Sequence, residues 1–269
     1  MTPSEAPTGT RRKLVKSEAP TGARRKLVKR VGKKLLRGVL HDFLARQSKV
    51  PNDPILDASL FPWAEDFRAN WVTIRNELDR QLVHRSALPN FQDISPDQYR
   101  ISPDSMWKTF VFVGFGEPSE LNRELCPETA KALDRIPRLQ TAFFSVLAPG
   151  KHVPRHRGVT KGLVRCHLPL RVPKDAEKCV MDVGDVRCVW KEGVPLFFDD
   201  TYPHEVWNET EEERAVLLFD FERPMRRGGR WVSRLALRIL RFTAYFRDAQ
   251  RNQRAWEERY RKVAKGPAA

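Results

Sequence analysis

Two histidines and several cationic side chains have the residue types needed to hold a divalent metal beside a dicarboxylate. His156 and His204 could be the metal ligands, because neutral imidazole suits Fe(II). Arg165 and His167 follow the first histidine, and Arg214 lies ten residues after the second. The planar fork of an arginine meets a carboxylate with two hydrogen bonds, and a nearby histidine can donate a third. These residues suit an iron site with a dicarboxylate cosubstrate.

The first histidine lacks the acidic neighbour that often completes such a site. A non-haem iron site commonly uses two histidines and one carboxylate, spelled His-x-Asp/Glu, whereas this chain reads His156-Arg157-Gly158. These residues alone leave a structural role open, since a lone histidine in a β-rich run more often packs than binds a metal. For Arg214 the corresponding alternative is a surface salt bridge with the acids at 211–213.

Short apolar runs punctuated by Gly and Pro fill residues 140–221 and predict a sandwich or barrel rather than a βαβ fold. Arg165 and His167 are two apart on one expected strand, so both should point to one face and Cys166 to the other. Arg214 begins the last strand, which is deeply apolar, so a lone arginine there is costly unless paired. Strands are expected at Ala142–Leu147, Leu163–Leu170, Cys179–Val183, Cys188–Trp190, Leu196–Phe198, Glu205–Trp207 and Ala215–Phe221.

Helical and irregular segments are expected before these strands, over residues 45–140. Apolar residues at helical spacing predict a helix over Phe67–Leu82, and Pro127 in the first turn favours another over Cys126–Leu133. The run Trp107–Phe115 is strongly β-prone. The fold class expected is mainly β with flanking helices.

The net charge of +15 is concentrated at the two ends of the chain. Residues 1–50 carry +11 and residues 221–269 carry +10, which leaves −6 for the centre. Basic ends favour contact with a polyanion, either nucleic acid or anionic lipid. A 13-residue unit at 4–16 recurs at 17–29 and predicts a disordered basic arm. The arm lacks interleaved aromatic residues, so nucleic acid is not the expected partner.

Amphipathic helices with basic residues are expected at both ends. One is predicted within Val31–Leu44 and another over Arg230–Phe246, each with an apolar stripe beside Lys or Arg. Such a helix can lie in a lipid interface, or it can simply pack on the domain. The sequence leaves both interpretations open.

The cysteine pattern indicates a reducing compartment. No CxxC spacing suggests a zinc cage or a disulfide framework. We expect no signal peptide, because the N-terminus lacks an uninterrupted apolar core. We expect no membrane-spanning helix, because no run of about 18 apolar residues exists. The four cysteines are Cys126, Cys166, Cys179 and Cys188.

Three segments together resemble the aspartyl/asparaginyl β-hydroxylase family: FFSVLAPGKHVPRHRG, LVRCHLPL and FFDDTYPHEVWNETEEERAVLLFDFERPM. The resemblance covers about residues 105–225. It implies an Fe(II)- and 2-oxoglutarate-dependent dioxygenase, using O2, with a double-stranded β-helix (jelly-roll, cupin-like) core. Members of this family can lack the metal-binding carboxylate, so Gly158 is compatible with activity.

The resemblance also implies roles for individual residues. His156 and His204 would be the iron ligands, and Asp200 would be an acid that hydrogen-bonds an iron-bound water. The contacts to 2-oxoglutarate would come from four side chains: Ser145, Arg165, His167 and Arg214.

The substrate implied by the resemblance is an acyl chain of a membrane lipid. The spellings FFS, WNET and ERPM and the Arg-rich tail are similar to those of the bacterial lipid hydroxylases of the family, which act on lipid A or on ornithine lipids. We expect a cytoplasmic protein, peripheral on the inner face of the membrane through its basic ends. Two alternatives stay open: a soluble hydroxylase of peptidyl Asp/Asn or a small amino acid, and a non-enzymatic β-barrel with basic tails.

Four segments are expected along the chain. They are a disordered basic repeat arm at 1–30, an amphipathic helix at 31–50, a dioxygenase domain at 51–225 and a basic amphipathic C-terminal helix at 226–269.

Overall fold

The computed structural model describes residues 38–114 and 116–264. The chain divides into two compact units, Met1–Leu40 and His41–Ala269. The repeat arm predicted at 1–30 lies outside the described residues, as does the first part of the helix predicted at 31–50. Residues 38–47 are helical. The fold described below is that of the second unit.

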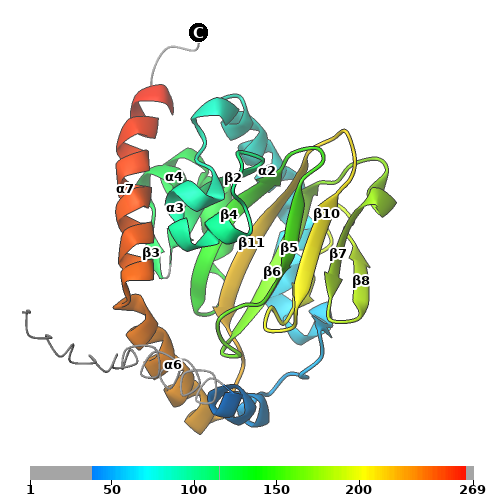
Figure 1. Ribbon diagram of the computed structural model, residues 1–269, viewed down its shortest axis with the longest axis vertical. Helices are drawn as coiled ribbons and strands as arrows, with labels where there is room; N and C mark the ends of the chain where they lie inside the picture. Colours follow the sequence, from blue (N-terminus) through cyan, green and yellow to red (C-terminus); the bar gives the residue numbers. More distant parts are fainter. Residues whose placement is uncertain (1–37, 115, 265–269) are drawn as a thin grey trace, which may run out of the picture. The chain divides into compact units, whose positions relative to one another are not determined.

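A seven-stranded antiparallel sheet forms the larger layer, in the order β1-β9-β6-β11-β4-β2-β3 (Figure 1). Its central strand β11 pairs over its length with β4 on one side and β6 on the other. The strands are β1 (Ile55–Leu56), β2 (Trp107–Gly114), β3 (Glu117–Pro118), β4 (Leu139–Leu147), β6 (Leu163–Arg171), β9 (Leu196–Phe198) and β11 (Arg214–Glu222).

A four-stranded antiparallel sheet forms the smaller layer, in the order β5-β10-β7-β8. A buried apolar cluster that includes Trp107, Leu147, Met181 and Val206 joins strands of both sheets. The smaller sheet consists of β5 (His152–His156), β7 (Cys179–Val183), β8 (Val186–Val189) and β10 (His204–Asn208). This pair of antiparallel sheets confirms the predicted jelly-roll core.

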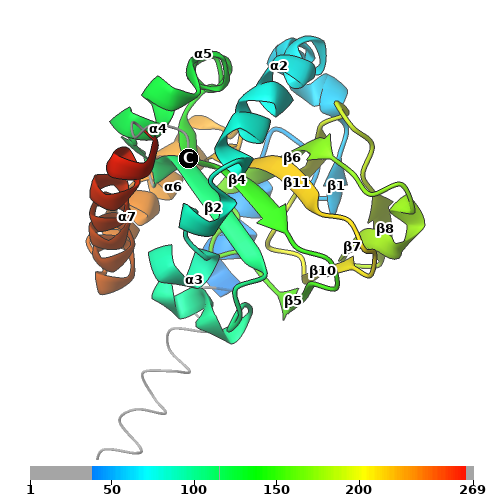
Figure 2. The same ribbon diagram turned by 90° about the horizontal axis from the view of Figure 1, so that it is seen from above.

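Helices cover the opposite face of the larger sheet (Figure 2). Phe67 of α2 stacks on Phe219 of β11 with ring centroids 5.3 Å apart. The main apolar core lies between this helix layer and the sheet. The helices are η1 (Ala58–Leu60), η2 (Pro62–Ala64), α2 (Glu65–Leu82), η3 (Arg85–Ala87), α3 (Phe91–Ile94), η4 (Pro96–Arg100), α4 (Glu120–Leu125), α5 (Pro127–Asp134), η5 (Ala176–Lys178), α6 (Arg227–Arg241) and α7 (Ala244–Ala264).

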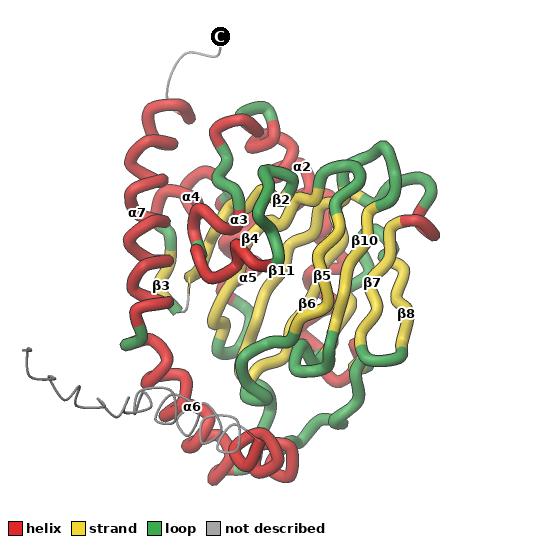
Figure 3. Tube along the Cα trace, viewed as in Figure 1, coloured by secondary structure: helices red, strands yellow, loops and turns green. Residues whose placement is uncertain are grey.

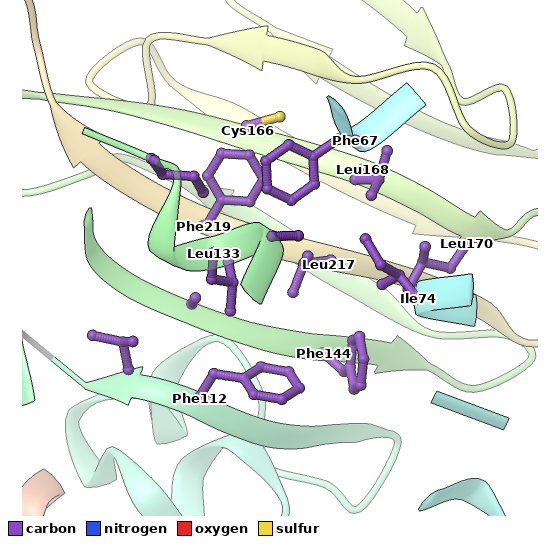
Figure 4. Packing of buried hydrophobic residues seen from close by; sticks show 14 of the residues in the cluster. Phe67, Ile74, Phe112, Leu133, Phe144, Cys166, Leu168, Leu170, Leu217 and Phe219 are labelled. Carbon is purple, nitrogen blue, oxygen red and sulfur yellow. The ribbon is translucent and has the colours of Figure 1, made fainter. Parts of the chain in front are cut away.

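Strand alternation decides which side chains can reach the space between the sheets. Figure 4 shows Cys166, Leu168 and Leu217 packed in the main core on the helix side. Side chains of successive strand residues point to opposite faces, so Arg165 and His167 point between the two sheets. The predicted orientation of this strand is confirmed.

One predicted helix is wrong, the strand predicted at Cys188–Trp190 lies at Val186–Val189, and one strand was not predicted. The single helix predicted over Arg230–Phe246 is wrong: α6 ends at Arg241 and α7 begins at Ala244 (Figure 3). Between them the Thr243 hydroxyl donates to the Leu240 carbonyl at 2.7 Å, an interaction that helps to end α6. Strand β5, which contains Pro154, was not among the expected strands. It lies at a sheet edge, where a proline is tolerated.

Candidate active site

The two candidate metal ligands meet across the smaller sheet. His156 ends β5, His204 begins β10, and the two residues are direct partners in the ladder. Their ring centroids lie 4.1 Å apart. The Nδ1–H of His156 donates to the Pro154 carbonyl at 2.8 Å, and that of His204 donates to the Tyr202 carbonyl at 3.0 Å. Because a carbonyl only accepts, each neutral ring keeps its lone pair on Nε2, which is the atom that a metal would bind.

Burial keeps both imidazoles neutral. It lowers the pKa of His156 to about 4, and the charge of Arg165 adds to this effect. Burial, the neighbouring His156 and Arg165 lower the pKa of His204 to about 3. Both rings are therefore in the neutral form at neutral pH, which is the form that a metal ligand requires.

An acid from another loop fills the space left by the missing acid at 158. The Gly158 amide donates to the Asp200 carbonyl at 2.6 Å. A Cβ built on Gly158 would overlap the carboxylate of Asp200. Glycine at 158 is therefore required by this packing, and the Asp200 carboxylate lies where the first atoms of an acidic side chain at 158 would lie. Within the described residues, no group of three or more His, Cys, Asp or Glu side chains forms a metal cage.

Arg165 is held by two acids. Its Nε and Nη2 donate to the two carboxylate oxygens of Asp220 at 2.7 and 2.9 Å. Its Nη2 also lies 3.3 Å from a carboxylate oxygen of Asp200. Arg165 thus orients Asp200 beside the histidine pair. A contact between Arg165 and the cosubstrate would be made alongside these acids, and it stays a prediction.

Arg214 is a buried cation with no carboxylate partner among the described residues. It is 2% exposed, and its Nε and Nη1 have no hydrogen-bond partner there. Its guanidinium lies over the Trp190 ring, 4.6 Å from the centroid. The alternative of a surface salt bridge is wrong, since the neighbouring Glu213 pairs with Arg85 instead. Burial lowers the pKa of Arg214 to about 10, which leaves it charged at neutral pH.

His167 completes the buried pocket around Arg214. Its ring centroid lies 6.0 Å from that of Trp190, and the two ring planes are inclined by 28°. Its Nδ1 is buried and has no hydrogen-bond partner among the described residues. Burial and the charge of Arg214 lower its pKa well below the usual range, so the ring is neutral. Unsatisfied buried polar groups are rare and costly. A guanidinium and an imidazole that are both buried and both have nitrogen atoms without hydrogen-bond partners indicate a site for an anion.

Ser145 lies on the same inner face of the larger sheet. It is the ladder partner of Val216, and the neighbouring pair on this face joins Leu147 to Arg214. Its hydroxyl oxygen accepts from the Trp107 indole at 3.0 Å. The hydroxyl proton remains available to donate to an anion. The structure thus places Ser145, His167 and Arg214 on one face.

A buried ionic network anchors the loop that carries Asp200 and His204, and sequence reasoning missed it. Asp199 is fully buried and receives Arg223 Nη1 at 2.7 Å and Lys161 Nζ at 2.6 Å. These two cations hold the pKa of Asp199 below its ordinary value despite its burial. Arg223 lies in the ERPM motif, so that motif was the available signal.

The family follows from the match of the central region. Residues 68–224, which include every candidate site residue, match the family model for aspartyl/asparaginyl β-hydroxylase. The chain belongs to this family. The match spans more than half of the chain and all the strands from β2 to β11.

Individual members of the family differ in how much of their length they share with this chain. The ornithine lipid ester-linked acyl 2-hydroxylase of Rhizobium tropici is 42% identical over 80% of this chain and 76% of its own length. The human aspartyl/asparaginyl β-hydroxylase is 29% identical over 58% of this chain but only 20% of its own length. The family and these relatives support a hydroxylase.

Solved structures are only weakly similar to this chain. The viral collagen prolyl hydroxylase of Paramecium Bursaria Chlorella virus-1, in its 2OG complex, has a TM-score of 0.31. It is 13% identical and covers 45% of this chain and 80% of that chain. The jelly-roll fold therefore rests on the strand order and register described above.

Proposed function

We propose that this chain is an Fe(II)- and 2-oxoglutarate-dependent dioxygenase that hydroxylates an acyl chain of an ornithine-type membrane lipid. The name of the Rhizobium tropici relative supports the lipid and the 2-position of an ester-linked chain. Lipid A is the second lipid of the predicted class. The protein would act at the inner face of the membrane. Within residues 38–114 and 116–264, no helix has the length and apolar character needed to span a membrane.

The observation that carries the proposal is the unpaired cationic pocket beside the histidine pair. A buried guanidinium without a counter-ion is unfavourable unless a ligand supplies one. The carboxylate of 2-oxoglutarate that lies remote from the metal would accept from Arg214 and from the Ser145 hydroxyl. Phe198 links this pocket to the histidine pair, because its ring centroid lies 5.0 Å from that of His167 and 5.7 Å from that of His204.

The residues present fit a ferrous ion. His156 and His204 would hold it through Nε2, and water and the cosubstrate would supply the other ligands. Iron with 2-oxoglutarate and O2 supplies the oxidising power for attack on an unactivated C–H bond. The chain's own part is to bind, orient and exclude water. Asp200, held by Arg165, would accept a hydrogen bond from a water at the metal.

A purified-protein assay tests the reaction. Wild-type protein with Fe(II), 2-oxoglutarate and ornithine lipid should release succinate and yield a lipid heavier by one oxygen atom. His156→Ala and His204→Ala should each abolish both products, because one imidazole cannot hold the metal alone. Mass spectrometry of lipids from cells with and without the protein gives the same comparison in vivo. Succinate release without any oxidised lipid, from ornithine lipid or lipid A, would contradict the lipid assignment.

The similarity to the human relative keeps a second candidate, hydroxylation of peptidyl Asp or Asn. The same assay separates the two, because a peptide substrate would replace the lipid in driving succinate release. A non-enzymatic basic-tailed barrel would release none. The unpaired Arg214 argues against that third candidate, since a scaffold gains nothing from a buried cation that lacks a partner.

A further inference from the structure

Helix α6 carries an exposed apolar stripe along its length. Four large apolar side chains on it are 42–74% exposed: Trp231, Leu235, Ile239 and Phe242, the last at the helix end. At about 100° per residue, they fall within an arc of roughly 80° on the helix surface. Exposed aromatic and aliphatic residues gathered in this way mark a contact surface rather than ordinary scatter.

Arginines run along one edge of this stripe. Arg227, Arg230 and Arg238 are exposed, and they fall in the adjoining arc of roughly 80°. No carboxylate pairs with these three among the described residues. Two further arginines of the same edge hold the helix to the domain: Arg234 donates to Glu222 at 2.9 Å and Arg241 to Gln140 at 2.9 Å.

The opposite face of α6 packs against the loop between β5 and β6. A Cβ built on Gly162 would overlap the Ser233 hydroxyl, so helix and loop touch closely there. Gly162 lies between His156 of β5 and Arg165 of β6. In the same loop Val159 is 53% exposed. The loop that follows His156 therefore packs on the buried face of α6, roughly one helix diameter (about 10 Å) from the exposed stripe.

We propose that this apolar–arginine surface of α6 docks the protein on an anionic lipid surface. The helix would lie in the plane of the interface, with the apolar stripe among the acyl chains and Arg227, Arg230 and Arg238 at the headgroups. Charge complementarity selects the occupant, since a surface that adds cations to an exposed apolar stripe matches anionic headgroups above hydrocarbon. Nucleic acid would use the arginines but would leave Trp231 and Phe242 in water. The surface deepens the proposed function, on which it rests for its role in delivering a lipid substrate.

Binding of the full-length protein to vesicles tests the surface without any turnover. Vesicles of phosphatidylcholine with phosphatidylglycerol are sedimented with the protein at 0.15 M and 0.5 M salt. The other basic residues of the chain also attract anionic vesicles, but this attraction is largely screened at the higher salt, where the Debye length falls to roughly 4 Å. Binding that persists at 0.5 M salt therefore reports the apolar stripe. Vesicles of phosphatidylcholine alone should bind far less at 0.15 M salt.

The apolar variant is Trp231→Ser with Ile239→Ser and Phe242→Ser. It should weaken binding at 0.5 M salt by at least about tenfold, since three largely exposed side chains would lose their burial in lipid. The matched control changes three exposed valines away from α6 and should bind as the wild type does. It combines Val72→Ser, Val83→Ser and Val186→Ser.

Three results would overturn the docking surface. The first is equal binding of the apolar variant and the wild type at 0.5 M salt. The second is wild-type binding that vanishes completely at that salt. The third is conversion of a dimer to a monomer by the apolar variant, because the stripe would then contact a second copy. Vesicle binding that behaves as expected in a protein that oxidises no lipid would instead leave the surface standing and reject the proposed reaction.

Discussion

Replacing Arg214 with methionine should stabilise the protein without cosubstrate and should weaken cosubstrate binding. Methionine has a similar length and no charge, so it can lie over Trp190 in the same apolar surroundings. The opposite directions of the two effects make this change more informative than a loss of activity alone.

The expected gain in stability follows from the burial of the Arg214 guanidinium. Burial lowers the pKa of Arg214 from 12.5 to about 10. At about 1.4 kcal/mol for each tenfold change, the charged form is disfavoured by roughly 3 kcal/mol. Loss of the contact with Trp190 offsets about 1–2 kcal/mol of this. The free energy of unfolding of Arg214→Met should therefore rise by about 1–2 kcal/mol, as replacement of buried ions by apolar residues often does.

The expected loss of cosubstrate affinity comes from removing a charge-assisted contact, shielded from water, between Arg214 and a carboxylate of 2-oxoglutarate. Removal of one partner from such a pair costs about 2–5 kcal/mol, so 2-oxoglutarate should bind about 30-fold to several-thousand-fold more weakly. Urea denaturation without cosubstrate measures the gain. Calorimetry with Mn(II), which occupies the same ligand types without turnover, measures the loss. The exposed Arg254→Met serves as the control and should change neither quantity by more than about 0.5 kcal/mol.

A less stable Arg214→Met protein would show that the guanidinium has a structural partner in the fold. Unchanged 2-oxoglutarate affinity in a correctly folded variant would show that the pocket binds something else. Either result refutes the assignment of Arg214 to the cosubstrate.

Three further predictions concern the metal site and its support. The folded-state pKa values of His156 and His204 lie below 6.5, so the stability that the neutral rings contribute is present above pH 6.5 and is lost as the pH falls toward about 4 and 3. The free energy of unfolding at pH 5 should be lower than at pH 7 by roughly 2 kcal/mol for each histidine. A variant with glutamine at both positions that shows the same dependence of stability on pH would contradict this. Gly158→Ala should cost about 1–3 kcal/mol by overpacking against the Asp200 carboxylate. Gly158→Asp should weaken metal binding through the same clash, and adding Asp200→Gly to it should restore the binding measured by anaerobic titration; failure of the double variant alongside a stable fold would mean that the two positions are not interchangeable. Arg223→Met should cost about 3–5 kcal/mol in urea denaturation, because it leaves a buried acid with one cation fewer, whereas the exposed Arg187→Met should cost under about 1 kcal/mol.

The strands and the helix-side core could be predicted from the sequence because their signals are local. Apolar alternation and Gly/Pro punctuation predict the strand from Leu163, and alternation alone places Cys166 opposite Arg165. The helix over Phe67–Leu82 follows from a stripe at helical spacing. Strand β5 was hidden, because Pro154 and the polar residues around it carry no strand signal and the sheet edge that tolerates them is a tertiary feature.

The candidate site residues could be named in advance, but their partners could not. The approach of Asp200 to Gly158 joins two loops 42 positions apart in the chain. No local pattern reports that contact, and Gly158 by itself only suggested that an acid was missing. The sequence also did not predict that Arg214 lacks a carboxylate partner. The neighbouring Glu213 suggested a salt bridge with Arg214, but in the structure Glu213 pairs with Arg85.

Strand β11 connects the separate parts of the proposed machinery. Arg214 opens the strand in the proposed cosubstrate pocket, and Asp220 near its end holds Arg165, which contacts Asp200. Arg223, just beyond the strand, anchors the loop before His204 through its ion pair with Asp199, and α6 begins four residues later. Pairing with β4 and β6 fixes the register of β11 on both sides. A slip of one residue would turn Arg214 and Asp220 into the apolar helix-side core and lift Ala215 and Phe219 out of it. The hydrophobic pattern that fixes this register therefore also sets the position of the proposed cosubstrate pocket, the orientation of Asp200 and the starting point of α6, the proposed docking helix.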